Sequence, residues 1–223
     1  MVRLPRLAVA VLAVAVLAAP PSILPGRSVP GLPSIQSGRT VPGVPSIQIA
    51  EKLLYDIDVA PHGPQKGYSR ELFPHWISLP GKCNTRKLVL QRDGSNAITG
   101  DACAILSGTW YSPYDGKTWS NASDVDIDHM VPLSNAWKSG AAAWTTDQRR
   151  DFANDLSNPQ LWVVTDEVNR RKSDRGPELW MPPLESYHCT YARAWIKVKS
   201  VYNLSVTKEE RDALYSMLDT CYS

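Results

Sequence analysis

The stretch Asp124–Leu133, DVDIDHMVPL, places three carboxylates at alternating positions directly before a histidine. Its alternation with Val125 and Ile127 is typical of a β-strand, in which successive side chains point to opposite faces. Carboxylates bind hard cations such as Mg²⁺, and an imidazole titrates near neutral pH. The pair Asp128-His129 therefore predicts a metal ligand beside a general base.

Asn169 lies 40 residues after His129 and belongs to the same predicted arrangement. A second strand is expected over 160–165 and a helix over 165–176. Strand, strand and helix form a unit compact enough to bring Asp128, His129 and Asn169 together. The sequence therefore predicts one site built from a carboxylate, an imidazole and an amide.

Such a site suits hydrolysis of a phosphodiester. A carboxylate and an amide oxygen favour Mg²⁺, with Mn²⁺ or Ca²⁺ as alternatives, over Zn²⁺. Two protein ligands leave coordination positions for water and substrate. A neutral histidine beside the metal can take a proton from water, while the metal offsets charge on the phosphate. The expected partner is nucleic acid, with DNA favoured over RNA.

Cations near Asn169 could hold the phosphates. Asn169, Lys172 and Ser173 are spaced i, i+3 and i+4, so they share one face of a helix, and Arg170 adds positive charge. We expect Lys172 and Arg170 to bind phosphate. Arg86 is a further candidate, with pairing to a carboxylate as its alternative role.

Three motifs in order, DIDHMVPL, NDLSNPQL and VNRRKSD, resemble the HNH nuclease superfamily, also known as ββα-metal or His-Me finger enzymes. The chain looks closest to a secreted branch related to the C-terminal nuclease domain of GmrSD-type restriction enzymes. The resemblance covers the chain from about Tyr68 to its end. It implies an α+β fold in which a ββα-metal core carries an inserted helix, flanking helices and a C-terminal, disulfide-linked helix pair.

The resemblance also implies roles for matching residues. His129 would be the general base, Asp128 and Asn169 would ligate a divalent metal, and Asn158 would brace the loop that orients His129. Asp126 could support the ligands by hydrogen bonding, whereas Asp124 is expected to face water. The chain departs from the family in two ways: the last motif position is often His and is Asn here, and a helical insert over 144–156 lengthens the motif.

The N-terminus has the pattern of a secretory signal peptide over residues 1–22, with two arginines before an apolar run. A membrane anchor is the alternative, but the run is shorter than the about 20 residues that span a bilayer. Residues 23–50 contain a duplicated unit, GRSVPGLPSIQ and GRTVPGVPSIQ, and are predicted to be a Pro/Gly-rich linker or pro-segment. A docking peptide is the alternative. Residues 51–223 then form the nuclease domain.

The net charge of the full chain does not describe the predicted domain, because the N-terminal residues 1–48 are basic. Four of the 24 Lys and Arg residues lie in residues 1–48, which hold no acidic residue. The remaining 20 basic and 22 acidic residues give residues 49–223 a formal charge of −2. This balance excludes a strongly cationic, nonspecific polyanion binder. Positive charge at a nucleic-acid site must be local.

An even number of cysteines in a secreted chain indicates disulfides. Of the three possible pairings we favour Cys83–Cys103 and Cys189–Cys221. Cys189 opens one predicted helix and Cys221 closes the next, and these two ends adjoin in an antiparallel helix pair. A zinc site is disfavoured because no Cys-x-x-Cys pair occurs. Asn121 and Asn203 begin sequons that can accept glycans.

The remaining expectations concern local structure. Helices are expected over 49–57, 68–74, 145–157, 165–176, 191–199 and 208–220, and strands over 86–93, 103–112, 124–131 and 160–165. An Asp-Gly turn is expected at Asp115-Gly116. Trp110 and Trp119 are the favoured base-stacking candidates, and the other tryptophans considered are expected in the core; His75 and His188 are expected to be structural.

The sequence thus predicts a secreted, divalent-metal-dependent endonuclease of low sequence specificity, with no membrane association of the mature form and no obligate protein partner. The alternative is a secreted nucleic-acid-binding or effector protein on a nuclease fold that has no significant catalysis.

Overall fold

The computed structural model describes residues 41–222. The predicted signal peptide, the first copy of the repeat and the beginning of the second lie outside the described residues. The end of the second copy is packed against the domain, since Val41 and Val44 contact the core and the Arg193 side chain donates to the Pro45 carbonyl. Helix α1 begins at Ile47, so packed structure starts before residue 51.

The domain mixes helices and short strands, as expected for an α+β chain. The α-helices are α1 (Ile47–Asp56), α2 (Thr85–Asp93), α3 (Leu133–Lys138), α4 (Thr146–Ala153), α5 (Asp166–Lys172), α6 (His188–Val201) and α7 (Lys208–Asp219). The strands are β1 (Ser78–Leu79), β2 (Cys83–Asn84), β3 (Gly94–Thr99), β4 (Ile105–Tyr111), β5 (Thr118–Trp119), β6 (Val125–His129) and β7 (Leu161–Thr165). Single 3₁₀ turns are η1 (Arg70–Leu72), η2 (Pro80–Lys82), η3 (Asp101–Cys103), η4 (Ala141–Ala143), η5 (Glu185–Tyr187) and η6 (Thr220–Tyr222).

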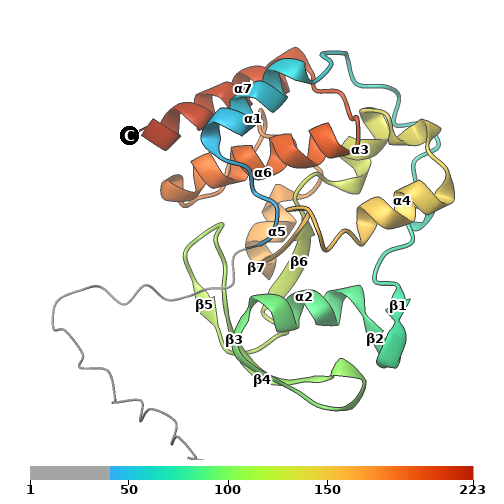
Figure 1. The fold of residues 1–223 in the computed structure, drawn as a ribbon, viewed down its shortest axis with the longest axis vertical. Helices are drawn as coiled ribbons and strands as arrows, with labels where there is room; N and C mark the ends of the chain where they lie inside the picture. Colours follow the sequence, from blue (N-terminus) through green and yellow to red (C-terminus); the bar gives the residue numbers. More distant parts are fainter. Residues whose placement is uncertain (1–40, 223) are drawn as a thin grey trace, which may run out of the picture. The chain divides into compact units, whose positions relative to one another are not determined.

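The described strands form three small antiparallel sheets, β1-β2, β3-β4-β5 and β6-β7. In β6-β7, Asp126 lies opposite Val164 and Asp128 opposite Trp162. Helix α5 follows β7 directly and contacts both strands, while α2 contacts them as well. Figure 1 shows this central hairpin between the helices α1, α6 and α7 and the β3-β4-β5 sheet.

Two hydrophobic clusters hold the hairpin in place. One contains Val125 and Ile127 of β6 together with Val89 and Leu90 of α2. The larger cluster contains Val164 of β7 and the buried residues of α6 and α7. Neighbouring residues of β7 enter different clusters, Val163 the first and Val164 the second, because side chains alternate between the two faces of a sheet.

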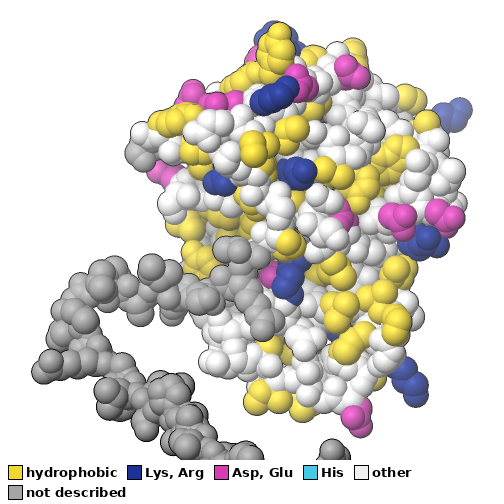
Figure 2. Space-filling view, viewed as in Figure 1, with side chains coloured by type: hydrophobic (Ala, Val, Ile, Leu, Met, Phe, Trp, Pro, Cys, Tyr) yellow, Lys and Arg dark blue, Asp and Glu magenta, His cyan; other side chains and the backbone are white. Residues whose placement is uncertain are grey.

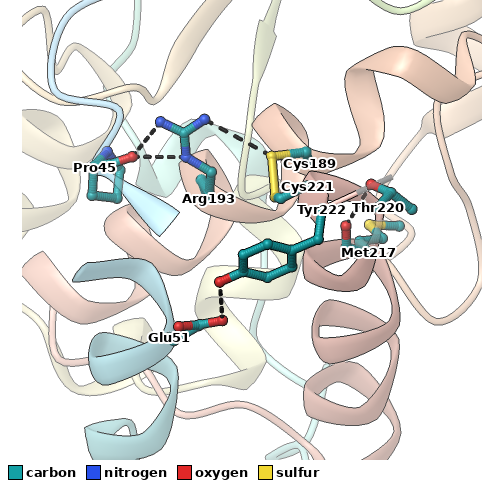
Figure 3. Close-up of a disulfide and its surroundings, with 8 residues drawn as sticks. All are labelled: Pro45, Glu51, Cys189, Arg193, Met217, Thr220, Cys221 and Tyr222. Atoms are coloured by element: carbon teal, nitrogen blue, oxygen red, sulfur yellow. Dashed lines mark hydrogen bonds between the residues drawn. A yellow bond between two sulfur atoms is a disulfide. The ribbon is translucent and has the colours of Figure 1, made fainter. Parts of the chain in front are cut away.

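The C-terminal helices α6 and α7 pack on each other and on α1. The Cys189–Cys221 disulfide joins the start of α6 to η6, the turn that directly follows α7, in agreement with the predicted antiparallel helix pair. The Tyr222 hydroxyl donates to Glu51 of α1 (Figure 3). The Cys83–Cys103 disulfide links β2 to η3. Both are the pairs that the sequence favours.

Two predicted elements differ from the structure. Residues 86–93, expected as a strand, form helix α2, because the Asn84 side chain caps the Lys87 amide and the buried residues recur at helical spacing. Residues 68–74, expected as a helix, contain only the single turn η1. A proline disfavours helical geometry at the residue before it, and Phe73, which precedes Pro74, has a non-helical backbone with φ −109° and ψ 87°.

The surface carries no broad basic region on the face in Figure 2, where Lys and Arg side chains are scattered among hydrophobic and acidic ones. None of the helices between residues 41 and 222 is both long and apolar enough to cross a membrane. The sequon residues Asn121 and Asn203 are both exposed.

A buried ion pair joins the two C-terminal helices. Lys199 of α6 and Glu210 of α7 are fully buried, and their charged atoms lie 3.1 Å apart. The Trp195 indole N–H donates to Glu210 at 2.6 Å, and Lys199 also donates to Asn135 of α3. Removing one partner would leave the other charge buried without compensation, which is far more costly than losing a surface pair.

We expect Glu210→Ala to lower the free energy of unfolding by about 3–5 kcal/mol, because Lys199 is left unpaired. Urea unfolding followed by circular dichroism would measure the change. The control is Glu209→Ala, an exposed neighbour in the same helical turn, for which a change within about 0.5 kcal/mol is expected. Equal unfolding midpoints for the two variants would show that the pair contributes nothing.

Candidate active site

One cavity of about 350 Å³ brings the predicted residues together. Its lining includes Asp128 and His129 from β6 and Asn169 from α5. The other lining residues are Tyr68, Arg70, Ile127, Pro132, Leu133, Ser134, Arg170, Ser173 and Asp174. The carboxylate, the imidazole and the amide of the predicted site therefore share one cavity.

The alternation of β6 sorts its acids from its apolar residues. Val125 and Ile127 pack in the cluster with α2, whereas Asp126 and Asp128 bond to residues of α5. Asp126 pairs with Asn169, and Asp128 pairs with Lys172. A spacing of two residues on the strand therefore corresponds to a spacing of three residues on the helix. Asp124, outside this register, is exposed, in agreement with its predicted role.

Asp128 is a buried carboxylate with two partners. The Lys172 ammonium, fully buried, lies 2.8 Å from Asp128 Oδ2 and 3.0 Å from Oδ1. The Tyr114 hydroxyl donates to Oδ2 at 2.5 Å. Lys172 also donates to the carbonyl of His129 at 2.9 Å, so one cation holds both the carboxylate and the backbone of the neighbouring histidine.

Burial dominates the electrostatics of this pair. Desolvation raises the pKa of Asp128, and the Lys172 ammonium and the Tyr114 hydroxyl oppose that rise. Desolvation also lowers the pKa of Lys172 against the attraction of Asp128, and it raises the pKa of Tyr114. Tyr114 therefore remains a protonated donor to Asp128 at neutral pH.

His129 is held as a neutral imidazole. Its side chain is 5% exposed, and burial lowers its pKa to about 3, opposed by a hydrogen bond to the Ala153 carbonyl. Nε2 lies 2.9 Å from that carbonyl oxygen. A carbonyl can only accept, so Nε2 carries the hydrogen and Nδ1 is the unprotonated nitrogen. At neutral pH the imidazole is therefore unprotonated at Nδ1, where it carries a lone pair.

The ring of His129 is also fixed by an aromatic contact. Trp76 stacks on it with ring centroids 5.4 Å apart and an interplanar angle of 29°. Trp76 has a φ of 55°, a conformation that is uncommon for a bulky residue and is maintained only where the surroundings impose it. The Asn154 amide supplies part of this constraint, since it accepts from the Ile77 amide and donates to the Pro74 carbonyl.

Asn158 lies in the loop between α4 and β7, and among the described residues no hydrogen bond joins its side chain to His129. Its side-chain amide donates to Asp155 at 2.8 Å, and its backbone amide donates to the same carboxylate. Ala153, whose carbonyl holds His129, ends α4 directly before this loop. The bonds of Asn158 thus lie within this loop, and its bracing role towards His129 stays a prediction.

Asn169 is oriented by Asp126. The Asn169 Nδ2 donates to Asp126 Oδ2 at 3.2 Å, which leaves Asn169 Oδ1 as the acceptor of the amide available to another group. The predicted support of Asn169 by Asp126 has a direct geometric counterpart in this bond.

The predicted phosphate-binding cations are arranged differently from expectation. Lys172 is fully buried against Asp128, so its ammonium is not free for a substrate phosphate. Arg86 donates from Nη2 to the carbonyls of Ala122 and Val125 and is not among the residues that line the cavity. Arg170 lines the cavity and is exposed, but it pairs with Asp166 at 3.1 Å. The position of a residue on a helical face does not show whether its side chain forms an ion pair with a buried acid.

The donor set fits a hard cation. Asp128 and Asn169 offer oxygen ligands in one cavity, and Asp128 Oδ1, whose partner is Lys172 alone, keeps a lone pair for a metal. Among residues 41–222, no group of three or more His, Cys, Asp and Glu side chains is arranged to hold a metal ion. A metal here would depend on the Asn169 amide and on water or substrate oxygens, which suits Mg²⁺ better than Zn²⁺.

Sequence reasoning did not single out several residues of this site, and it misplaced Trp110, which lies outside the cavity lining. Tyr114, Trp76 and Arg70 lie outside the three motifs; the only signal near any of them was the Asp-Gly turn that follows Tyr114. Trp110, expected as a stacking platform, is buried and donates to the Leu90 carbonyl, because its strand faces α2.

The comparisons with known proteins agree with the motifs. A family model for the C-terminal domain of GmrSD restriction endonucleases matches residues 86–217. A protein of Arthroderma benhamiae described as an uncharacterized secreted protein is 67% identical over 172 residues, which cover 77% of this chain and 84% of the relative. No solved structure matches the chain.

The predicted secretion is confirmed, because this relative is named a secreted protein and two disulfides are typical of proteins outside the reducing cytosol. The family suggests nuclease activity. With more than half of its length matched, and with the motif residues Asp128, His129 and Asn169 in one cavity, the chain belongs to the family of the GmrSD restriction endonuclease C-terminal domain.

Proposed function

We propose that the protein is a secreted, divalent-metal-dependent endonuclease that hydrolyses phosphodiester bonds of nucleic acid, with DNA as the favoured substrate. The observation that carries the proposal is the cavity that Asp128, His129 and Asn169 share in a chain of a restriction-endonuclease family. In this proposal β6, β7 and α5 are the ββα-metal core, and residues 1–22 are removed as a signal peptide.

His129 acts as the general base. Its unprotonated Nδ1 takes a proton from the attacking water, while Nε2–H remains on the Ala153 carbonyl. The stacked Trp76 and this carbonyl limit rotation of the ring, and Lys172 fixes the His129 backbone. A preset orientation matters because small misplacements of a catalytic group are costly. Asn158 contributes by fixing the loop that follows Ala153.

Asp128 and the Oδ1 of Asn169 would hold the metal, with Mg²⁺ the first choice and Mn²⁺ or Ca²⁺ as alternatives. A bound divalent ion would offset charge on the scissile phosphate and on the departing oxygen. Asp126 keeps the Asn169 amide turned so that Oδ1 is available. Lys172 and Tyr114 hold the Asp128 carboxylate in position.

Low sequence specificity follows from the kind of contacts that the cavity offers. The charged and polar side chains around His129 suit phosphate oxygens, and contacts to phosphate carry no sequence information. The second candidate function is a nucleic-acid-binding or effector protein without significant catalysis. The neutral, oriented imidazole next to two oxygen ligands favours the enzyme.

We expect His129→Ala to lower the rate of plasmid nicking in Mg²⁺ by about 10²–10⁴-fold, the usual contribution of a general base. Circular dichroism would check that the variant is folded. Chelation of the metal should abolish cleavage by the unmodified protein.

The matched control is His188→Ala. His188 bonds to the Pro182 carbonyl and is not among the residues that line the cavity, so cleavage should be preserved. A His129→Ala variant that cuts at the rate of the unmodified protein would falsify the mechanism. Cleavage of RNA but not DNA in the same assay would reverse the substrate preference.

Asp126→Ala is expected to weaken metal binding by about 10–100-fold, because a ligand that loses its supporting hydrogen bond is no longer oriented. Titration of the metal-free protein with Mn²⁺ in a calorimeter would measure the dissociation constant. Asp124→Ala is the control, since this acid is exposed two residues earlier and should leave the constant unchanged. Equal losses in both variants would mean that Asp126 acts only through general negative charge.

A further inference from the structure

Arg70 lines the same cavity as Asp128, His129 and Asn169, although it lies outside the three motifs. It belongs to the segment Tyr68–Trp76, which precedes residues 86–217, the part of the chain that matches the family model. Two members of this segment, Tyr68 and Arg70, line the cavity, and a third, Trp76, stacks on His129.

In the described residues, the guanidinium of Arg70 forms no ion pair with a carboxylate. In the part of the chain that the structure describes, no ion pair involves Arg70, whereas Arg170 pairs with Asp166 and Lys172 with Asp128. The hydrogen bond of its guanidinium runs from Nε to His75 Nε2 at 3.4 Å, and within residues 41–222 none involves Nη1 or Nη2. Among the described lining residues, Arg70 is the cation with its charge unpaired.

The backbone that carries Arg70 is anchored. Ser69 caps η1 by accepting from the Glu71 amide, and the Phe73 amide donates to the Arg70 carbonyl. Phe73 is fully buried, and the Arg149 side chain donates to the Leu72 carbonyl at 3.0 Å. An exposed side chain on a fixed turn is thus presented to the cavity, which reduces the ordering cost of binding a ligand.

Arg70 is also close to the proposed base. His75, which accepts from Arg70, lies edge-on to His129 with ring centroids 6.5 Å apart. The positive charge of Arg70 contributes to the lowered pKa of His129, after the larger effect of burial. Because Arg70 lines the cavity that contains His129, its guanidinium can contact a substrate phosphate positioned for attack.

We propose that Arg70 binds a phosphate of the nucleic-acid substrate, so that the segment Tyr68–Trp76 is part of the substrate-binding site. The two free nitrogens of a guanidinium suit paired hydrogen bonds to phosphate oxygens, which a lysine ammonium cannot reproduce. This inference rests on the proposed function. It assigns to Arg70 a phosphate contact that Lys172, buried against Asp128, and Arg86, outside the cavity lining, do not offer there.

The test measures binding of a labelled DNA duplex in Mg²⁺, in the His129→Ala background so that the DNA stays intact, over a series of salt concentrations. Arg70→Gln should weaken binding by about tenfold or more and lower the slope of log affinity against log salt by about 1. Arg70→Lys should keep the slope but bind more weakly than the arginine protein. The matched control, Arg150→Gln, removes an exposed arginine of α4 that pairs with Asp147 and does not line the cavity, and should change neither quantity.

Cleavage of the same duplex by proteins that retain His129 separates the two levels of the inference. Absence of cleavage by the unmodified protein would overturn the proposed function, and the binding data would still decide on Arg70. If the unmodified protein cleaves, and Arg70→Gln matches Arg150→Gln in affinity and salt slope, Arg70 makes no phosphate contact. Weaker binding by Arg70→Gln with an unchanged salt slope would also overturn the proposed phosphate contact. Such a result would indicate that the substitution acts through packing.

Discussion

The ion pair between Lys172 and Asp128 is the interaction on which the site depends. A buried charge is costly unless it is paired and hydrogen-bonded, so each partner requires the other. Lys172 comes from α5, Asp128 from β6, and Tyr114, from the connection between β4 and β5, completes the carboxylate's partners. Because Lys172 also bonds to the His129 carbonyl, the same cation sets the position of the proposed base.

The residues at the centre of the site, on β6 and α5, could be predicted because their positions follow from local sequence spacing. Alternation on β6 separates the acids from Val125 and Ile127, and α5 follows β7 without a linker. The strand spacing of Asp126 and Asp128 then matches the helical spacing of Asn169 and Lys172. Type and spacing thus indicated which side chains meet. They did not indicate that Lys172 would be buried, because burial depends on α6, whose Trp195 lies under its ammonium.

The walls of the site could not be predicted, because tertiary packing places them. Trp76 reaches His129 only through a left-handed backbone conformation, and Asn154, which helps to impose it, lies 78 residues further along the chain. Arg70 is positioned by one short turn fixed by Phe73 and Arg149. Helix α2 was misread as a strand, because Arg86–Asp93 places apolar residues at its centre and its helical cap lies outside it, at Asn84.

The burial of His129 has a consequence for the protonation state of the proposed base. Outside the cell the medium can become acidic, and an exposed histidine would then take up a proton and lose its basicity. With its pKa lowered to about 3, His129 stays neutral well into that range. The packing of the ring against Trp76 and the end of α4 therefore favours the neutral imidazole over the imidazolium, a property set by the fold and not by the motif.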